Sequence, residues 1–276
     1  MTVTNDMILS YEKNLMQEEK AEATIKKYMH DVHAFADWLC GRDAEKCLLL
    51  TYKSLLEEKY KPTSVNSVIA SLNNFFMYIG KYDLRMKTIK IQKGLFVSKE
   101  KELTKHEYER LLYAAKSNKR LHLLMQTICS TGIRVSELPS VTVESITAGE
   151  AKINCKGKIR KIFLPNLLCE KLSSYIAETG VSSGPVFVTK SGRPIDRSNI
   201  WSDMKKLCDS AGVSHKKVYP HNLRHLFACT YYSSQKDIVK LADILGHSNI
   251  NTTRIYTMES GERHRRQLEN LGLVQK

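Results

Sequence analysis

Residues 84–101, LRMKTIKIQKGLFVSKEK, separate two strongly patterned halves of this 276-residue chain. The segment is rich in lysine and lacks the apolar positions three and four residues apart that mark a long amphipathic helix. A basic, unpatterned stretch between two patterned regions is typical of a linker. The sequence therefore predicts two domains, over residues 1–84 and 102–276, joined by a linker over residues 85–101.

Apolar side chains in residues 1–84 recur at helical spacing in several separate runs. The two longest runs cover residues 25–39 and 65–79, and a glycine follows each of them closely, as it often does at helix ends. Thr63 precedes the second run and is a residue type that caps helix N-termini. Together with shorter runs, this spacing predicts a compact bundle of three or four helices.

Residues 102–276 combine helical runs with a short stretch of extended pattern. Thr104 and Glu107 match a capping box at the start of a helix. Around residues 151–163, two short extended runs flank a turn with one glycine and two lysines, which predicts a β-hairpin with a basic tip. Helical spacing returns after residue 167. The predicted fold class is therefore mainly α with a small β-sheet.

The charge balance is strongly basic, with 43 Lys and Arg against 29 Asp and Glu and a formal net charge of +14. Residues 1–95 hold 14 basic and 12 acidic side chains, whereas residues 96–276 hold 29 and 17. A positive field of this size favours a polyanion, because each neutralised phosphate releases condensed counterions. A nucleic acid is therefore a candidate partner, and a solvated lysine surface is the alternative.

The composition, 42% hydrophobic and 26% charged, is typical of a globular protein and excludes disordered and collagen-like chains. No apolar run approaches the roughly 18 residues that a membrane span needs. The first residues lack the basic start and apolar run of a signal peptide. Seven dispersed cysteines without a CxxC pair indicate reduced thiols. We therefore expect a cytoplasmic protein without membrane contact.

Four segments place polar side chains in otherwise apolar surroundings. They are residues 131–138, TGIRVSEL, residues 220–225, PHNLRH, residues 245–257, LGHSNINTTRIYT, and the hairpin tip at residues 156–158. Each alone has an ordinary interpretation, namely a surface ion pair, a helix N-terminus, a core tyrosine and a solvated turn. Together they hold the arginines, histidines, lysine and tyrosine that metal-free transesterification of a phosphodiester requires.

The motifs together resemble the tyrosine recombinase and integrase family, close to its Xer-type and phage-integrase-type members. The order Arg, Lys, His-x-x-Arg, His and Tyr along the chain and the short spacing from His247 to Tyr256 carry this resemblance, which covers nearly the whole chain. It implies a helical, SAM-like core-binding domain followed by an α+β tyrosine recombinase catalytic domain. The two domains would form a C-shaped DNA clamp.

The resemblance also implies a role for each matching residue. Arg134 and Arg224 would hold the scissile phosphate, and His247 would donate a further hydrogen bond to it. His221 would assist the removal of a proton. Tyr256 would attack the phosphorus and form a covalent 3′-phosphotyrosyl bond, so that the chain would cut and rejoin DNA strands.

A lysine from the hairpin would protonate the departing 5′-hydroxyl. Lys156 matches the Gly-Lys-Gly that the family often has at this tip, but the segment before it is shorter than in many relatives. Lys158 is therefore an alternative for the same role. Glu137 is expected to orient Arg134 and not to take part in the chemistry itself.

No cofactor or metal is expected for such a reaction. His221 and His225 have a spacing that binds zinc on a helix, but the glutamate of an HExxH motif is absent and the nearby arginines would repel a cation. A metal-dependent nuclease and a DNA-binding regulator that does not cleave are the alternatives to a recombinase.

The implied partner is double-stranded DNA that carries a specific recombination site. Four protomers would act on two duplexes and pass through a Holliday junction, so we expect a homotetramer on DNA. Residues 257–276 would dock on a neighbouring protomer as an exchanged C-terminal tail, or would pack on their own domain. A protein of this kind would be associated with the bacterial nucleoid.

Overall fold

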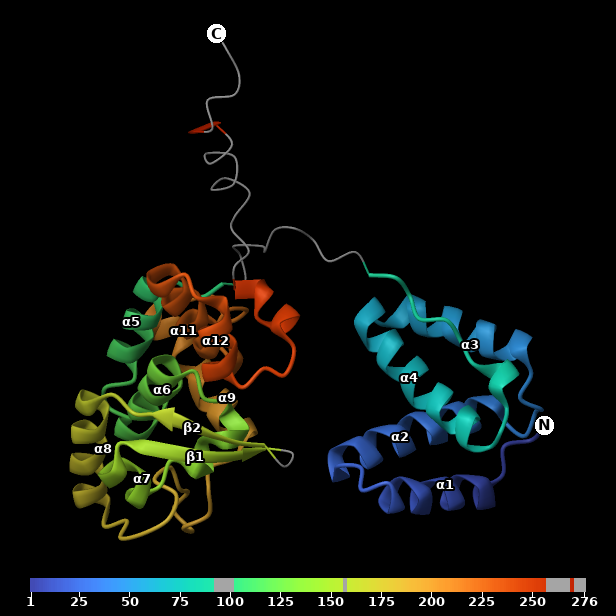
Figure 1. Cartoon of the computed structure of the whole chain (residues 1–276), viewed down its shortest axis with the longest axis horizontal. Coiled ribbons are helices and arrows are strands. Elements are labelled where there is room, and N and C mark those ends of the chain that lie inside the picture. The colour runs from blue at the N-terminus through green and yellow to red at the C-terminus, as the bar shows by residue number, and fades with distance from the viewer. Residues whose placement is uncertain (92–101, 156–157, 257–268, 271–276) are drawn as a thin grey trace. The chain divides into compact units, whose positions relative to one another are not determined.

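The computed structural model describes residues 1–91, 102–155, 158–256 and 269–270 (Figure 1). Contacts between Cα atoms divide the chain into two compact units, Met1–Lys93 and Gly94–Lys276. Each unit has a hydrophobic core of its own. Because these two cores share no residue, each unit is stabilised by its own buried side chains.

Unit 1 is a helical bundle. Its described elements are α1 (Asn5–Gln17), α2 (Glu22–Leu39), α3 (Lys46–Lys59), α4 (Pro62–Tyr78) and the 3-10 helix η1 (Tyr82–Leu84). Tyr11, Phe35, Phe75 and Phe76 are fully buried, and their rings pack against one another. The prediction of a helical bundle is confirmed, because the aromatic residues at helical spacing form its core.

Helix α4 begins at Pro62 and has no side-chain cap. Lys61 is its N-cap residue, and Pro62 occupies the first turn. Proline suits this position because it lacks the backbone N–H that a helix start would leave unpaired. The prediction that Thr63 caps this helix is therefore wrong.

The segment after η1 packs on α4. The Asn73 side chain donates to the carbonyl of Met86 at 2.8 Å and accepts from its N–H at 2.7 Å. Asn66 binds the backbone of Ile89 in the same two-way manner, at 2.9 and 2.7 Å. Residues 85–91, which the sequence pattern assigns to the linker, are thus held by side chains of unit 1. The rest of that linker, residues 92–101, lies outside the described residues.

Unit 2 is mostly helical and contains the one sheet found among the described residues. Its elements are α5 (Lys105–Ala114), α6 (Lys119–Thr131), η3 (Val135–Ser140), α7 (Val143–Ala148), β1 (Glu150–Cys155), β2 (Lys158–Phe163), α8 (Asn166–Thr179), α9 (Arg197–Lys206), α10 (Cys208–Ala211), α11 (Pro220–Gln235), α12 (Ile238–Leu245), η4 (Ile250–Thr252) and η5 (Arg254–Tyr256). The predicted capping box at Thr104 and Glu107 is present at the start of α5. The fold class, mainly α with a small β-sheet, is confirmed.

The predicted hairpin is formed by β1 and β2. The strands pair antiparallel, from Glu150 opposite Phe163 to Cys155 opposite Lys158. Alternate residues of β2 face opposite sides of the sheet. Arg160 therefore lies on the same face as Ile162, which is buried in the core of unit 2.

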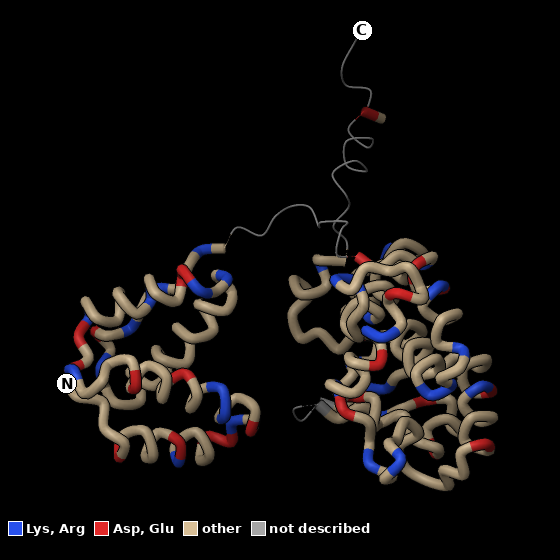
Figure 2. Tube along the Cα trace, turned by 180° about the vertical axis from the view of Figure 1, so that it is seen from behind, with Lys and Arg blue, Asp and Glu red and all other residues tan. Residues whose placement is uncertain are grey.

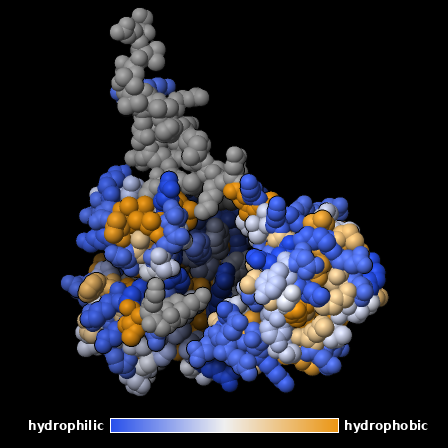
Figure 3. All heavy atoms as spheres, turned by 45° about the vertical axis from the view of Figure 1, so that its right-hand side comes forward, coloured by the Kyte–Doolittle hydropathy of each residue, from blue (hydrophilic) through white to orange (hydrophobic). Residues whose placement is uncertain are grey.

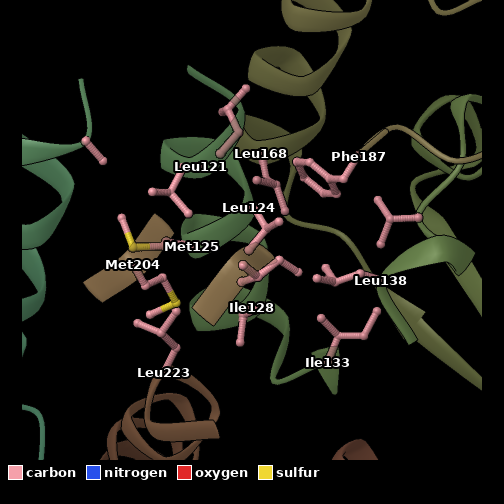
Figure 4. Packing of buried hydrophobic residues seen from close by; sticks show 14 of the residues in the cluster. Leu121, Leu124, Met125, Ile128, Ile133, Leu138, Leu168, Phe187, Met204 and Leu223 are labelled. Atoms are coloured by element: carbon pink, nitrogen blue, oxygen red, sulfur yellow. The ribbon is translucent and has the colours of Figure 1, made fainter. Parts of the chain in front are cut away.

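Helix α6 supplies several side chains to the core of unit 2 (Figure 4). Leu124, Met125 and Ile128 of this helix are fully buried. They pack with residues from other elements, among them Leu223 of α11 (Figure 4). The contact between α6 and α11 brings the C-terminal end of the first helix near the N-terminal part of the second. Two of the polar motifs, which are about 90 residues apart in the sequence, thereby become neighbours.

The face of the molecule in Figure 3 is mostly hydrophilic, with apolar side chains in small separate patches. Within the described ranges, none of the helices has the length and apolar character needed to span a bilayer.

Gly132 is the C-cap residue of α6 and lies close to α11, so a substitution there tests the packing of these two helices. Its φ is +67°, and a Cβ atom there would lie 2.5 Å from Cδ1 of Phe227 in α11. Gly149 has nearly the same φ, +68°, with no atom within 4 Å of such a Cβ. We expect Gly132→Ala to lower the free energy of unfolding by about 1–3 kcal/mol more than Gly149→Ala, because only the first change adds overpacking to backbone strain.

Urea unfolding of the two variants measures this difference directly. Equal losses in both would contradict the close approach of α6 and α11 at this glycine.

Candidate active site

Three guanidinium groups meet at the C-terminal end of α12. The carbonyl oxygen of Leu245 accepts hydrogen bonds from Arg224 Nη2 and Arg160 Nη1, both at 2.7 Å. The carbonyl oxygen of Gly246 accepts one from Arg134 Nη2 at 3.2 Å. The last carbonyls of a helix have no partner within the helix and carry partial negative charge. This end of α12 is therefore a natural binding point for cations.

Arg224 is the most deeply buried of the three arginines, with 2% of its surface exposed. It donates to the carbonyl oxygen of Gly132 through Nη1, and its Nη2 lies 3.1 Å from Nε2 of His247. Burial, followed by the nearby charge of Arg134, lowers the pKa of Arg224 to about 10. The guanidinium therefore remains charged at neutral pH.

Glu137 connects Arg134 with Arg160. Its Oε1 accepts from Arg134 Nη1 at 2.9 Å, and its Oε2 accepts from the Arg134 backbone N–H at 2.9 Å and from Arg160 Nη2 at 2.7 Å. The carboxylate is 6% exposed, so these contacts form largely out of water. The expected contact between Glu137 and Arg134 is thus present. Glu137 binds two of the three guanidiniums. The charges of these four described groups therefore sum to a positive total.

His247 is fixed at both ring nitrogens. Its Nδ1 lies 2.9 Å from Oγ1 of Thr253, and its Nε2 faces Nη2 of Arg224. Burial, followed by the charges of Arg224 and Arg134, lowers the pKa of His247 to about 4. The ring is therefore neutral at pH 7. Since a guanidinium can only donate, Nε2 accepts its hydrogen bond and the proton sits on Nδ1, which donates to Thr253.

Tyr256 lies beside this histidine and is 5% exposed. Its ring stacks on that of His247 with centroids 6.2 Å apart, and it meets the ring of His225 edge-on at 5.1 Å. Burial raises the pKa of the Tyr256 hydroxyl, while the charge of Arg224 and a hydrogen bond from it act in the opposite direction. The hydroxyl is therefore protonated at neutral pH and needs a base to become a nucleophile.

A cleft of about 350 Å³ opens beside the arginines. Arg134, His221 and Arg224 line it together with Arg197 and Trp201 of α9. His221 sits in the first turn of α11, directly after Pro220. The residue as a whole is exposed, but desolvation of its ring by the surrounding protein, followed by the charge of Arg224, lowers the pKa of His221. The neutral imidazole can therefore accept a proton at pH 7, and the cleft is large enough for a phosphate group with part of its sugar.

The structure brings together five of the six residues expected from the sequence. Arg134, Arg224, His247 and Tyr256 surround the end of α12, and His221 lies in the adjoining cleft. The sixth, Lys156, lies outside the described residues. Its alternative, Lys158, is the first residue of β2. No group of three His, Cys, Asp or Glu side chains with a metal-binding arrangement is found in the parts of the chain that the structure describes.

Arg160 is the residue at this site that the sequence analysis missed. It belongs to the hairpin, while its partner Leu245 lies 85 residues further along the chain. A signal was present in the strand pattern, because Arg160 falls on the same face as the apolar Ile162. A charged residue on the buried face of a strand needs a partner.

The lowered pKa of His247 predicts that the folded protein loses stability in mild acid. The pKa of His247, about 4, lies below its usual 6.5, so between these values the unfolded chain binds a proton that the folded chain does not. The stabilising contribution of the neutral ring is present above pH 6.5 and is lost as the pH falls towards 4. From pH 7 to pH 5 we expect this one group to lower the free energy of unfolding by about 1–2 kcal/mol, because solvent screens part of the effect at a half-buried ring.

Urea unfolding at pH 7 and pH 5 tests this for the wild type and for His247→Gln. Glutamine can still accept from Arg224, but it does not titrate, so the difference between the two pH values is expected to shrink. The same difference in both proteins would contradict a neutral His247.

Residues 101–263 match the model of the phage integrase family. Over its whole length the chain is similar to "Tyrosine recombinase XerA" of Thermococcus kodakarensis, with 30% identity over 99% of that protein. It is 27% identical to "Tyrosine recombinase XerD" of Vibrio cholerae over 88% of each chain.

Solved structures of such proteins share the fold. A crystal structure of XerA recombinase is 25% identical and aligns with a TM-score of 0.55, over 99% of this chain and 100% of that one. A lambda integrase dimer bound to a COC′ core site is 20% identical and aligns with a TM-score of 0.76, over 93% and 95% of the two chains. From the family match and the full-length similarity, this chain belongs to the phage integrase family and is Xer-like among the tyrosine recombinases.

Proposed function

We propose that this enzyme is a site-specific DNA recombinase that cuts and rejoins strands by metal-free transesterification through a covalent 3′-phosphotyrosine. The observation that carries the proposal is the convergence of Arg134, Arg224, His247 and Tyr256 on the end of α12. Two guanidiniums, that of Arg224 buried and that of Arg134 partly exposed, suit a reaction in which negative charge develops on phosphate oxygens.

In this proposal the two arginines hold the non-bridging oxygens of the scissile phosphate. Arg134 is one-third exposed and its bond to the Gly246 carbonyl is long, so a phosphate oxygen can replace that carbonyl as its acceptor. Arg224 is already fixed by the carbonyls of Gly132 and Leu245 and does not need to be reordered. Donors that are oriented before the substrate arrives stabilise the transition state without reorganisation.

The covalent step exchanges one ester for another. The hydroxyl oxygen of Tyr256 forms a bond to phosphorus, and the bond from phosphorus to the 5′-oxygen breaks. The phenolic proton passes to His221, whose neutral ring supports a role as general base. The leaving 5′-oxygen takes a proton from the hairpin lysine. No redox agent is needed, and reversal of the same step with another 5′-hydroxyl rejoins a strand.

His247 donates to the phosphate only once its Nε2 carries a proton. In the free protein this atom accepts from Arg224. A bound phosphate anion favours the protonated ring and raises its pKa, because the opposite charge offsets that of the arginines. We therefore expect DNA binding to be accompanied by uptake of a proton at His247.

The partner in this proposal is double-stranded DNA with a specific site. Lysines and arginines occur on both units (Figure 2), with the larger excess in residues 96–276. Among the structural neighbours are XerH bound to its difH substrate and a lambda integrase tetramer bound to a Holliday junction. They support a homotetramer that works through such a junction. Association with the bacterial nucleoid is a further part of the proposal. Exchange of the tail, residues 257–276, remains part of the proposal, and the structure describes only residues 269–270 of it.

A nicked suicide duplex with the chain's own site tests the nucleophile. The wild type is expected to form a covalent protein–DNA adduct, and Tyr256→Phe is expected to form none, because phenylalanine has no oxygen to bond to phosphorus. Tyr219→Phe is a matched control, since Tyr219 also lines the cleft. Denaturing gel electrophoresis measures the adduct.

Two outcomes of that assay would contradict the assignment. An adduct formed by Tyr256→Phe would mean that another residue attacks the phosphorus. Loss of the adduct in Tyr219→Phe would point to Tyr219 as the nucleophile. A wild type that binds its site without any adduct would favour a regulator that does not cleave. Loss of cleavage on addition of EDTA would favour a metal-dependent nuclease.

The hairpin lysine can be identified with a substrate whose bridging 5′-oxygen is replaced by sulfur. A thiolate leaves without protonation, so the sulfur substrate does not need a general acid. We expect Lys156→Ala to slow cleavage of the oxygen substrate by roughly 10²–10⁴-fold and to cleave the sulfur substrate at close to the wild-type rate. Lys158→Ala is the matched variant, and rescue of that variant instead would assign the role to Lys158.

A further inference from the structure

Arg160 of β2 makes contacts to two parts of the site at once. Its Nη1 donates to the carbonyl of Leu245 and its Nη2 donates to Oε2 of Glu137, both at 2.7 Å. The side chain is 16% exposed, so the guanidinium is held mostly out of water. One side of this group thus touches the helix end before His247, and the other touches the carboxylate that holds Arg134.

Gly246 shows how closely Arg160 packs on the turn before His247. A Cβ atom at Gly246 would lie 1.9 Å from Nη1 of Arg160 and 2.8 Å from its Cδ and Cζ atoms. The backbone at Gly246 also has a φ of +63°, which favours glycine. The Arg160 side chain therefore packs directly against the turn that carries His247 and leaves no space for a Cβ atom at Gly246.

We propose that Arg160 is a positioning residue for the recombination site, which fixes the turn at residues 245–247 and the carboxylate of Glu137 so that His247 and Arg134 face the phosphate. This inference rests on the function proposed above and adds a residue to it. In this proposal Arg160 acts through the carbonyl of Leu245 and the carboxylate of Glu137.

The geometry explains why arginine serves this role. The planar guanidinium presents separate N–H groups in two directions, so a single side chain reaches a backbone carbonyl and a carboxylate together. A lysine ammonium at the same position is a single point charge on a flexible stem. It would keep the positive charge but would not hold both partners in one fixed arrangement.

The contact also joins distant parts of unit 2. Glu137 belongs to η3, Arg160 to the hairpin, and Leu245 to α12. The hairpin strand therefore bridges the segment that supplies Arg134 and the segment that supplies His247. A displacement of about 1 Å at reacting groups can cost about 100-fold in rate, so loss of such a bridge is expected to affect the chemical step.

The test is the single-turnover rate of adduct formation on the nicked duplex, with the apparent Kd for the same DNA measured in parallel. We expect Arg160→Met to lower the rate at saturating DNA by about 10- to 100-fold and to change Kd by less than about threefold. Arg160→Lys is expected to give an intermediate rate. Lys161→Met is the control, because Lys161 is next on the strand and forms an exposed ion pair with Glu150.

A double-mutant comparison separates positioning from a general loss of structure. If Arg160 acts partly through Glu137, Arg160→Met should have a smaller effect on the rate in a Glu137→Gln background than in the wild type. Urea unfolding of each variant gives the folded fraction by which the rates are corrected. A rate defect that disappears after this correction would make Arg160 merely structural and would overturn the proposal.

The remaining outcomes are equally decisive. A wild-type rate in folded Arg160→Met overturns the proposal, and so does a large change in Kd at an unchanged rate, which would make Arg160 a DNA-binding residue. If neither the wild type nor Lys161→Met forms an adduct, the proposed function itself fails and the positioning role falls with it. An active wild type with an unaffected Arg160→Met leaves the function standing and removes only this inference.

Discussion

The C-terminal carbonyls of α12 are the interaction on which the site depends. Guanidinium groups repel one another, and a buried cation is costly unless hydrogen-bonded partners compensate it. The carbonyl oxygens of Leu245 and Gly246 receive three arginines, and Glu137 supplies the one carboxylate that binds two of them. This arrangement gathers positive charge before any phosphate is present. It also leaves a net charge that an anionic substrate can neutralise.

The same charge decides the protonation of the neighbouring groups. The arginines and burial keep His247 neutral, and burial keeps the hydroxyl of Tyr256 protonated despite the influence of Arg224. The free site is therefore not yet in its reactive protonation state. In the proposed reaction the phosphate supplies the missing negative charge, so substrate binding and activation are coupled by the same electrostatics. A protonated Tyr256 is a weak nucleophile, so in this proposal it does not attack until a base removes its proton.

Much of this site could be predicted from the sequence, and the exceptions have physical causes. Arg134, His221, Arg224, His247 and Tyr256 lie within short local motifs, and helical spacing together with a capping box located most of the helices around them. Arg160 was missed although it shares a strand face with the apolar Ile162, because its partner lies 85 residues away and leaves no local pattern. The start of α4 was misplaced because proline at a helix start competes with threonine as a signal. Residues 85–91 resemble a linker because their partners are the side chains of Asn66 and Asn73 in another segment.

The described residues of the candidate active site all belong to unit 2, whereas unit 1 has a separate hydrophobic core. Every site residue that the structure describes lies in unit 2, between Gly132 and Tyr256, and so do the hydrogen bonds and ring contacts that join these residues. Unit 1 has an aromatic core of its own and a charge balance close to neutral over residues 1–95. The geometry that holds the arginines, His247 and Tyr256 thus requires the packing of α6, α11, α12 and the hairpin. It does not require the core of unit 1, which is built from that unit's own buried aromatic and aliphatic side chains.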